Sequence, residues 1–302
     1  MFHAQNISSF DAPELQPYAT LRRPLEHEQR GIFVAESEKV VRRLLESKLT
    51  VVSVVLPEKW LESFRPLLEA RSENIAVYIA DKRLLESLVG FSMFQGILAV
   101  AKVPPPVSLE EILAGSPSPK LFVAVDELAN AENLGALVRN CVAFGVQALI
   151  VGETSSSPYL RRAVRNSMGT VFQLPVVELN QKRGPRESKA ELRRRKISND
   201  ASRECPPHNQ LNLAQIVLGL CSRGVRCIAA HPHSNKKILS QADFSGDCCI
   251  IFGSEGDGIS QNVLESCDEA VAIPMPLAVD SLNVGAAAAV FLYEVARQRR
   301  AA

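Results

Sequence analysis

The stretch IFGSEGDGIS, residues 251–260, places three glycines within six residues directly after an apolar run. That run, residues 248–252, is short and bounded by turn residues, which is typical of a buried strand in a parallel sheet. Three close glycines indicate that the backbone turns sharply or lies against another group. No Gly-Lys-Ser/Thr follows, and the G-x-x-G-x-G spacing is not that of a dinucleotide-binding motif. The residues alone therefore predict either a tight turn or a ligand loop at a strand end.

Strands and helices alternate from residue 120 to the C-terminus. This alternation indicates a parallel sheet with helices on both faces. The predicted strands are residues 121–127, 146–152, 225–230, 248–253 and 270–274. The predicted helices are residues 134–144, 211–222, 260–266 and 282–298.

A smaller α/β pattern precedes this sheet. Its predicted strands are residues 33–36, 51–56, 75–80 and 96–103, separated by helices, of which the one at 81–89 has Asp81 as its N-cap. We expect a small α/β sandwich domain over residues 1–103, a linker over 104–119 that holds a triple proline, and a second domain over 120–302.

The composition indicates a folded protein without a membrane segment. The 302 residues are 46% hydrophobic and 22% charged, as in ordinary globular domains. No apolar run approaches the roughly 18 residues that a membrane helix needs. The polar N-terminus, MFHAQNISSFDAPELQ, lacks the pattern of a signal peptide. The seven cysteines have no framework spacing, so we expect reduced thiols in a cytoplasmic protein.

The net charge of +1 hides a local basic excess. Residues 181–207 hold nine Lys/Arg and four Asp/Glu, and Arg161, Arg162 and Arg165 form a second basic cluster just before them. Local patches of this kind attract phosphates more than the total charge predicts. The segment 181–207 is interpreted as a surface insertion that is either an RNA-contacting arm or simply solvated.

Three segments that each follow a predicted strand hold the candidate functional side chains. In residues 127–145, Asn133 is placed to cap a helix, and Arg139 lies off the apolar face of that helix, where a plain surface charge is the alternative. The second segment is the glycine-rich loop. In residues 273–299, Ser281 is expected to cap the last helix and Asn283 to lie in its first turn.

Together these segments resemble the three signature motifs of the SPOUT superfamily, and specifically its TrmH/SpoU-like RNA 2′-O-ribose methyltransferases. The matching residues are NLGALVRN (133–140) with the following AFG, then FGSEGDGIS (252–260), then IPM (273–275) with SLNV (281–284). The resemblance covers nearly all of residues 120–299. The end of the N-terminal segment, GFSMFQGILAVAK (90–102), is similar to that of the ribosomal-protein-like RNA-binding domain that often precedes this catalytic domain.

The resemblance implies a parallel-sheet catalytic domain with a deep trefoil knot, a topology that general folding rules disfavour. It also implies S-adenosylmethionine as cofactor, held in a bent shape chiefly by main-chain groups. The implied cofactor-binding residues are Gly253, Gly256, Ile273, Met275 and Leu282. No metal is implied, because the sulfonium already activates the methyl group.

The resemblance assigns the loss of the ribose proton to Arg139. We interpret Arg139 as a fixed donor that stabilises alkoxide charge, because a guanidinium with a pKa above about 12 does not act as a base. Asn133, Ser281 and Asn283 are expected to position the ribose and Arg139, and Glu255 to orient these groups or meet the substrate. The expected substrate is RNA, with rRNA favoured over tRNA.

Family members pair through the last helix and the first-motif helix, so the resemblance implies a homodimer with the active sites near the interface. The small side chains of residues 285–289 suit such close packing, although from periodicity alone burial against the chain's own sheet is the favoured explanation. Two other functions stay open: a knotted RNA-binding protein without activity, and a dehydrogenase, which the turn at 126–136 disfavours because it lacks G-x-G-x-x-G.

Two further pairs, Cys205 with His208 and His231 with His233, raise the question of a zinc site. Their C-x₂-H and H-x-H spacings match no common structural set. We therefore expect no metal there. The position of His231 and His233 after the strand 225–230 predicts a place beside the cofactor instead.

Overall fold

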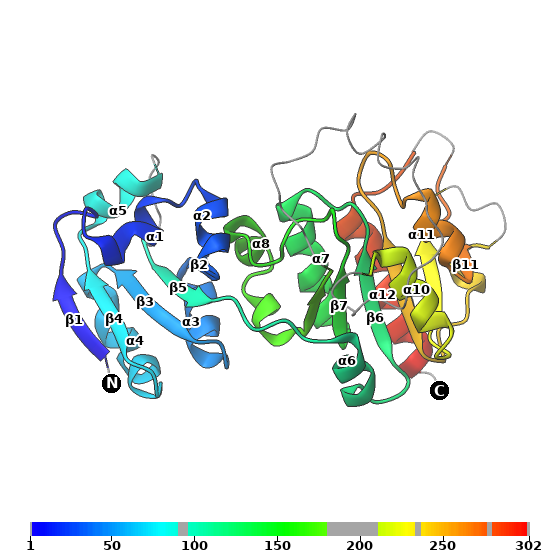
Figure 1. Ribbon diagram of the computed structural model, residues 1–302, viewed down its shortest axis with the longest axis horizontal. Coiled ribbons are helices and arrows are strands. Elements are labelled where there is room, and N and C mark those ends of the chain that lie inside the picture. Colours follow the sequence, from blue (N-terminus) through cyan, green and yellow to red (C-terminus); the bar gives the residue numbers. More distant parts are fainter. Residues whose placement is uncertain (1, 90–95, 180–210, 233–236, 277–279, 301–302) are drawn as a thin grey trace, which may run out of the picture.

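The computed structural model describes residues 2–89, 96–179, 211–232, 237–276 and 280–300. Two sheets lie side by side along the long axis of the molecule, the first formed by the N-terminal third of the chain and the second by the rest (Figure 1). The basic insertion predicted at 181–207 lies outside the described residues. No helix in the described part of the chain is long and apolar enough to cross a membrane.

The first sheet has five strands in the order β1-β4-β3-β5-β2. Strand β5 runs antiparallel to both of its neighbours, and the other pairs are parallel. One face is covered by α3 (Glu38–Glu46) and α4 (Glu58–Glu69), and the other by α1 (Gln16–Ala19) and α5 (Lys82–Val89). The strands are β1 (Phe2–Asn6), β2 (Ile32–Glu36), β3 (Val51–Leu56), β4 (Ile75–Ile79) and β5 (Leu98–Lys102). Asp81 caps α5 as predicted, because its Oδ1 accepts from the Leu84 N–H at 3.1 Å.

The second sheet has six strands in the order β11-β9-β10-β6-β7-β8, and all of its pairs are parallel. One face packs against α7 (Ala131–Ala143) and α12 (Val284–Arg300). The other packs against α6 (Leu109–Gly115), α10 (Leu213–Cys221) and α11 (Gln261–Ser266). The strands are β6 (Leu121–Val125), β7 (Ala148–Val151), β8 (Val176–Glu178), β9 (Arg226–Ala230), β10 (Cys248–Phe252) and β11 (Glu269–Val271).

The predicted α/β class with its parallel sheet is confirmed, and the reason is visible in the central strands. Every residue of β6, β7 and β10 is buried, since helices cover both faces of the sheet. Such strands appear in the sequence as uninterrupted apolar runs, which is how they were predicted. The trefoil knot stays a prediction from the resemblance.

Several elements were not predicted. Strand β1 was missed because it is an edge strand with mostly exposed residues, so it carries no apolar pattern. The segment 104–119, expected to be a linker, contains α6. Ser108 is the N-cap of this helix, and the Ser108 and Glu111 side chains form a capping box. Helices α2 (Pro24–Gln29) and α8 (Arg161–Asn166) were missed as well.

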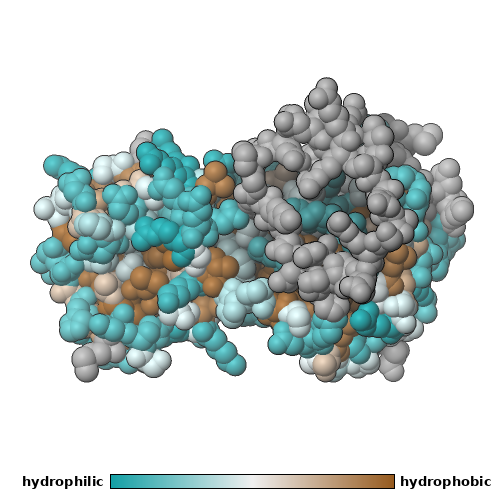
Figure 2. All heavy atoms as spheres, in the orientation of Figure 1, coloured by the Kyte–Doolittle hydropathy of each residue, from teal (hydrophilic) through white to brown (hydrophobic). Residues whose placement is uncertain are grey.

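The two sheets are joined by ion pairs to the buried Glu36 and by aromatic packing. Glu36 at the end of β2 is buried and binds Arg161 and Arg165 of α8, the second at 3.1 Å. Nearby, the Phe33 ring stacks on Phe172 with centroids 5.6 Å apart. Two of the three arginines of the predicted basic cluster therefore bind Glu36, and the third, Arg162, makes a longer ion pair with Glu132. We call the part of the molecule built on each sheet a lobe. Hydrophilic side chains cover much of the exposed surface of the first lobe (Figure 2).

Candidate functional site

A cavity of about 480 Å³ opens at the carboxyl ends of β9, β10 and β11. Its wall is built from the segments 230–232, 252–258, 271–275 and 280–291, which lie far apart in the sequence. The carboxyl end of a parallel sheet is where α/β folds bind ligands. All five residues predicted to hold a cofactor line this one cavity: Gly253, Gly256, Ile273, Met275 and Leu282.

The glycine-rich loop is a tight hairpin. Ser254 and Gly258 exchange two backbone hydrogen bonds, of 2.9 and 3.2 Å. A Cβ atom on Gly253 would lie 2.1 Å from the carbonyl carbon of Gly258, so only glycine fits there. Gly258 itself has a φ of +71°. Gly256, by contrast, has open space above it. Two glycines thus shape the turn, and Gly256 leaves the cavity side clear.

Asp126, which follows β6, holds both ends of this loop. Its buried carboxylate accepts from the Ser260 N–H at 2.8 Å, and its own N–H donates to the Phe252 carbonyl at 2.8 Å. The loop is therefore held at both ends by a residue of the neighbouring strand. Sequence analysis missed Asp126, although an acid directly after an apolar strand is the signal that could have identified it.

A chain of polar side chains lies beside the cavity. Asn133 donates from Nδ2 to Glu255, and its Oδ1 accepts from the Nδ2 of Asn283 at 3.0 Å. The three residues come from three separate segments: α7, the glycine-rich loop and the start of α12. The structure thus brings together three of the five residues predicted to take part in catalysis.

The capping roles predicted from the sequence were wrong for both motif helices. The N-cap of α7 is Asn130, whose Oδ1 accepts from the Asn133 N–H, so Asn133 lies inside the helix and is free to bind Glu255. At α12, Asn283 precedes the helix and accepts from the Gly285 N–H at 2.9 Å, the contact expected of Ser281. Ser281 instead lines the cavity with an exposed side chain.

The small residues of α12 pack against α7 of the same chain. A Cβ on Gly285 would lie 3.1 Å from that of Ala136, and Asn140 donates to the Gly285 carbonyl at 2.6 Å. The close approach predicted for residues 285–289 therefore occurs within the chain at Gly285. Ala287 lines the cavity.

Arg139 stands apart from the polar chain. Six residues are about one and two-thirds helical turns, so Arg139 leaves α7 on a different side from Asn133. Its side chain is exposed and does not line the cavity. The next turn on the same side is the exposed Ala143. Arg139 is thus not part of the cavity wall of its own chain.

An apolar surface extends from α7 onto α12 on this outer side. Tyr293 is 59% exposed and Val290 is 40% exposed. The Tyr293 ring packs edge-on against Phe144, with centroids 6.5 Å apart. We call Ala143, Phe144, Val290 and Tyr293 the outer apolar surface. Arg139 lies at its edge.

Of the residues considered for a zinc site, the structure describes His231 alone. His231 lines the cavity, as expected of a residue that follows β9. Cys205, His208 and His233 lie outside the described residues. In the described ranges, the one group of metal-ligating side chains that lies close together is elsewhere, on the edge of the sheet.

An all-parallel sheet with a ligand-sized cavity at its carboxyl ends defines an α/β protein with a small-molecule site. The model of the SpoU rRNA Methylase family matches residues 120–184 and 182–293. The chain belongs to this family.

Individual relatives agree with this assignment. An uncharacterized tRNA/rRNA methyltransferase of Mycobacterium avium is 31% identical over 236 residues, which are 76% of this chain and 65% of that protein. The chain thus spans about two thirds of that relative's length.

Two solved structures share the fold over almost the whole chain. The SpoU methyltransferase AviRb from Streptomyces viridochromogenes, in complex with AdoMet, has a TM-score of 0.74 at 22% identity and covers 96% of this chain and 100% of its own. An RNA 2′-O ribose methyltransferase has a TM-score of 0.71 at 24% identity and covers 98% and 100%.

Proposed function

We propose that this protein transfers the methyl group of S-adenosylmethionine to a ribose 2′-hydroxyl of structured RNA, with rRNA favoured over tRNA. One observation carries the proposal: the five candidate cofactor residues line a single cavity, and Glu255 joins that cavity to Asn133 and Asn283. The names of the relatives support RNA methylation and leave both tRNA and rRNA as substrates.

The residues of the cavity fit the cofactor. Phe252, Ile273 and Phe291 offer apolar walls to an adenine ring, and the space above Gly256 lets a ligand approach the backbone. The acidic side chains of Asp257 and Asp280 suit a positively charged ligand. Bound there, S-adenosylmethionine would supply a methyl group that is already activated.

The chain's own residues then have to align the ribose and assist the loss of its proton. Because both ends of the Asn133 amide are bound, its orientation is fixed, and that fixes the position of the Glu255 carboxylate at the cavity rim. The contact from Asn283 also links this rim to the start of α12. We assign these three residues to positioning the ribose.

Arg139 serves the active site of a second copy in this proposal. It does not line its own cavity but lies at the edge of the outer apolar surface, so we infer that a two-fold pairing through that surface brings each Arg139 toward the partner's site. We propose a homodimer that pairs through α7 and α12.

Light scattering tests the pairing. The wild-type chain is expected at about twice its mass of 33.0 kDa at micromolar concentration. Tyr293→Glu places a charge in the outer apolar surface and is expected to give a folded monomer with low activity. Leu218→Glu is the control, because Leu218 is equally exposed, at 55%, on the opposite face of the sheet. A wild-type mass near 33 kDa would refute the homodimer.

A basic cleft between the two lobes is our candidate path for the RNA. Its volume is about 530 Å³, and Arg22, Arg161 and Arg162 line it beside Ala131, the first residue of α7. The cleft therefore leads toward the helix that carries Asn133. Phosphates of the RNA would bind along it.

Charge reversal tests this path. Arg162→Glu is expected to weaken RNA binding roughly tenfold for all sequences and to lower its salt dependence, with unchanged affinity for S-adenosylmethionine. Arg223→Glu is the control. Both arginines are exposed, and each makes one long ion pair: Arg162 with Glu132 at 3.9 Å and Arg223 with Glu110 at 3.7 Å. Equal RNA affinity of the two variants would exclude the cleft.

The activity itself is tested by mapping 2′-O-methyl groups across total RNA from cells with and without the gene. Loss of one rRNA methylation supports the proposal, and loss of a tRNA methylation selects the alternative substrate. Calorimetry with S-adenosylmethionine and with NAD separates the other functions. Binding of NAD alone would refute a methyltransferase, and cofactor binding without any lost methylation would favour an inactive RNA-binding protein.

A further inference from the structure

Cysteines that are scattered in the sequence gather at one edge of the second sheet. Cys221 ends α10, Cys227 lies in β9, Cys249 lies in β10 and Cys267 follows α11. Cys249 is directly opposite Cys227 in the register of the two strands. Four of the six cysteines in the described ranges therefore lie together.

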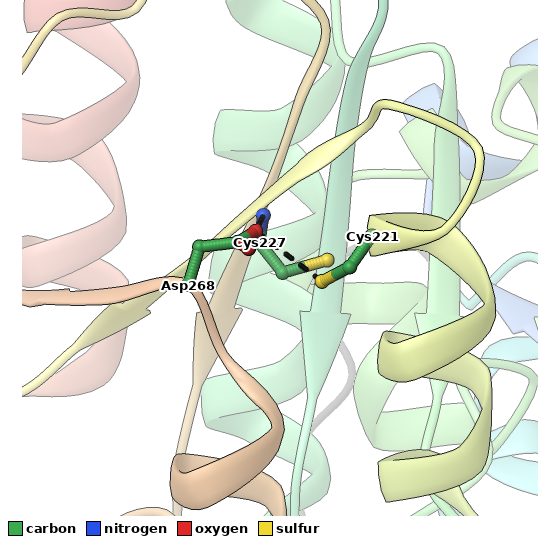
Figure 3. A group of neighbouring side chains, drawn as sticks. All are labelled: Cys221, Cys227 and Asp268. Carbon is green, nitrogen blue, oxygen red and sulfur yellow. Dashed lines mark hydrogen bonds between the residues drawn. The ribbon is translucent and has the colours of Figure 1, made fainter.

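Two of these thiols share a carboxylate neighbour. The Sγ atoms of Cys221 and Cys227 and a carboxylate oxygen of Asp268 all lie within 4.8 Å of one another (Figure 3). Oδ2 of Asp268 accepts from the Cys227 N–H at 2.7 Å and from the Cys221 thiol at 3.2 Å. Cys227 is buried, Cys221 is half-buried and Asp268 is exposed, so the group opens to solvent on the Asp268 side.

The carboxylate decides between the possible roles of this thiol pair. A purely apolar role, the usual one for buried cysteine, does not call for an acid held against the sulfurs. A regulatory disulfide is disfavoured, because a neighbouring negative charge suppresses the thiolate that must attack. For a thiophilic cation, the same carboxylate is a third ligand.

We propose that Cys221, Cys227 and Asp268 bind one zinc ion. Tetrahedral zinc with Zn–S bonds of about 2.3 Å places two sulfurs about 3.8 Å apart, which is inside the observed limit. Two thiol protons leave to solvent, and two thiolates, one carboxylate and Zn²⁺ then carry a net charge of −1. Water from the open side is the fourth ligand. The Cys227 N–H orients the ligating carboxylate, as outer-shell groups do in known zinc sites.

The location separates the ion from the cofactor cavity, and three protein ligands with one water differ from the closed four-ligand sets of common structural zinc sites. Cys227 lies near the amino end of β9, whereas the cofactor cavity opens at the carboxyl end of that strand, beyond Ala230. Asp268 directly precedes β11, the edge strand that pairs with β9. The ion would therefore tie the end of α10 to the two strands at the sheet edge. The zinc site does not depend on the proposed methyl transfer.

Metal analysis of the purified full-length chain tests the site. After exposure to equimolar Zn²⁺ and gel filtration, we expect about one zinc per chain and a rise in the melting temperature that a chelator reverses. Co²⁺ in place of Zn²⁺ should give an intense near-ultraviolet thiolate-to-cobalt band.

Matched variants exclude adventitious binding. Asp268→Asn keeps an acceptor for the Cys227 N–H at an exposed position, so this variant should fold. Its zinc content should be at least tenfold lower than that of the wild type. Cys221→Ser should lose both zinc and the cobalt band. Cys248→Ser is the control, because Cys248 is buried on β10 outside the group and should leave zinc content unchanged. No zinc above background in the wild type, equal loss in the control, or a Cys221–Cys227 disulfide in the intact mass would overturn the proposal.

Discussion

Arg139→Ala is expected to lower the turnover of RNA methylation by roughly 100-fold or more, the scale of losing one preorganised donor at developing negative charge. Affinity for S-adenosylmethionine should stay within about twofold, because Arg139 does not line the cavity. Single-turnover methyl transfer and calorimetry measure the two quantities separately. Arg139→Lys should restore little activity, because the planar fork of donors is lost.

Arg223→Ala, an exposed arginine on the opposite face of the sheet, is the control and should keep full turnover. If Arg139→Ala also keeps full turnover, Arg139 has no part in the mechanism. If it loses cofactor affinity in parallel, its role is in folding or binding and not in the chemical step.

Mixing two impaired variants, at a concentration of S-adenosylmethionine that saturates the wild type but not Gly253→Ala, shows whether Arg139 acts across the dimer. Arg139→Ala supplies an intact cavity, and Gly253→Ala supplies an intact Arg139. If the arginine serves the partner's cavity, each mixed dimer has one complete site, and random exchange gives about a quarter of wild-type activity. If it serves its own cavity, every site lacks one group and the mixture stays inactive. The two arrangements therefore give clearly different activities.

Prediction from the sequence worked best where burial is complete. Strand β10, which is buried throughout, was predicted within one residue, and β3, whose residues are buried except Val52, with its observed bounds, since interior strands are mostly apolar runs. The cavity residues were found because the resemblance supplied segments that the chain separates by tens of residues. Burial alone would not have joined Gly253 to Leu282.

What failed depends on contacts between distant residues or on the exact start of a helix. Asn133 was taken as an N-cap because it precedes the apolar face, but the helix begins at Ala131 and Asn130 caps it. That shift of three residues frees Asn133 to bind Glu255 and Asn283. The sequence spacing of Cys221, Cys227 and Asp268 does not predict their cluster, because a helix end and two strands bring the three residues together.

Gly253→Ala should lower the affinity for S-adenosylmethionine by roughly ten- to hundredfold. The new Cβ would lie 2.1 Å from the carbonyl carbon of Gly258 and 2.3 Å from the Ile259 nitrogen, so backbone and not a flexible side chain must move. Overpacking of this kind costs about 1–3 kcal/mol. The hairpin that exchanges hydrogen bonds between Ser254 and Gly258 would have to open, and Gly256 and Glu255 would shift with it.

Gly256→Ala isolates the cause, since it adds the same methyl group to the same loop. Nothing lies within 4 Å of a Cβ at Gly256, and its φ is outside the left-handed region, so the hairpin itself should remain unstrained. The two variants therefore separate the internal shape of the loop from its contact with the ligand. Calorimetry on both decides. A large loss of affinity for S-adenosylmethionine in Gly253→Ala, together with an unchanged melting temperature of Gly256→Ala, supports the hairpin as the element that shapes the cofactor site. Only the change at Gly253 disturbs backbone atoms that are already in contact. Equal affinity of Gly253→Ala and the wild type would show that the close approach of Gly253 to Gly258 does not shape the cavity, and the loop would then hold no cofactor in the way proposed.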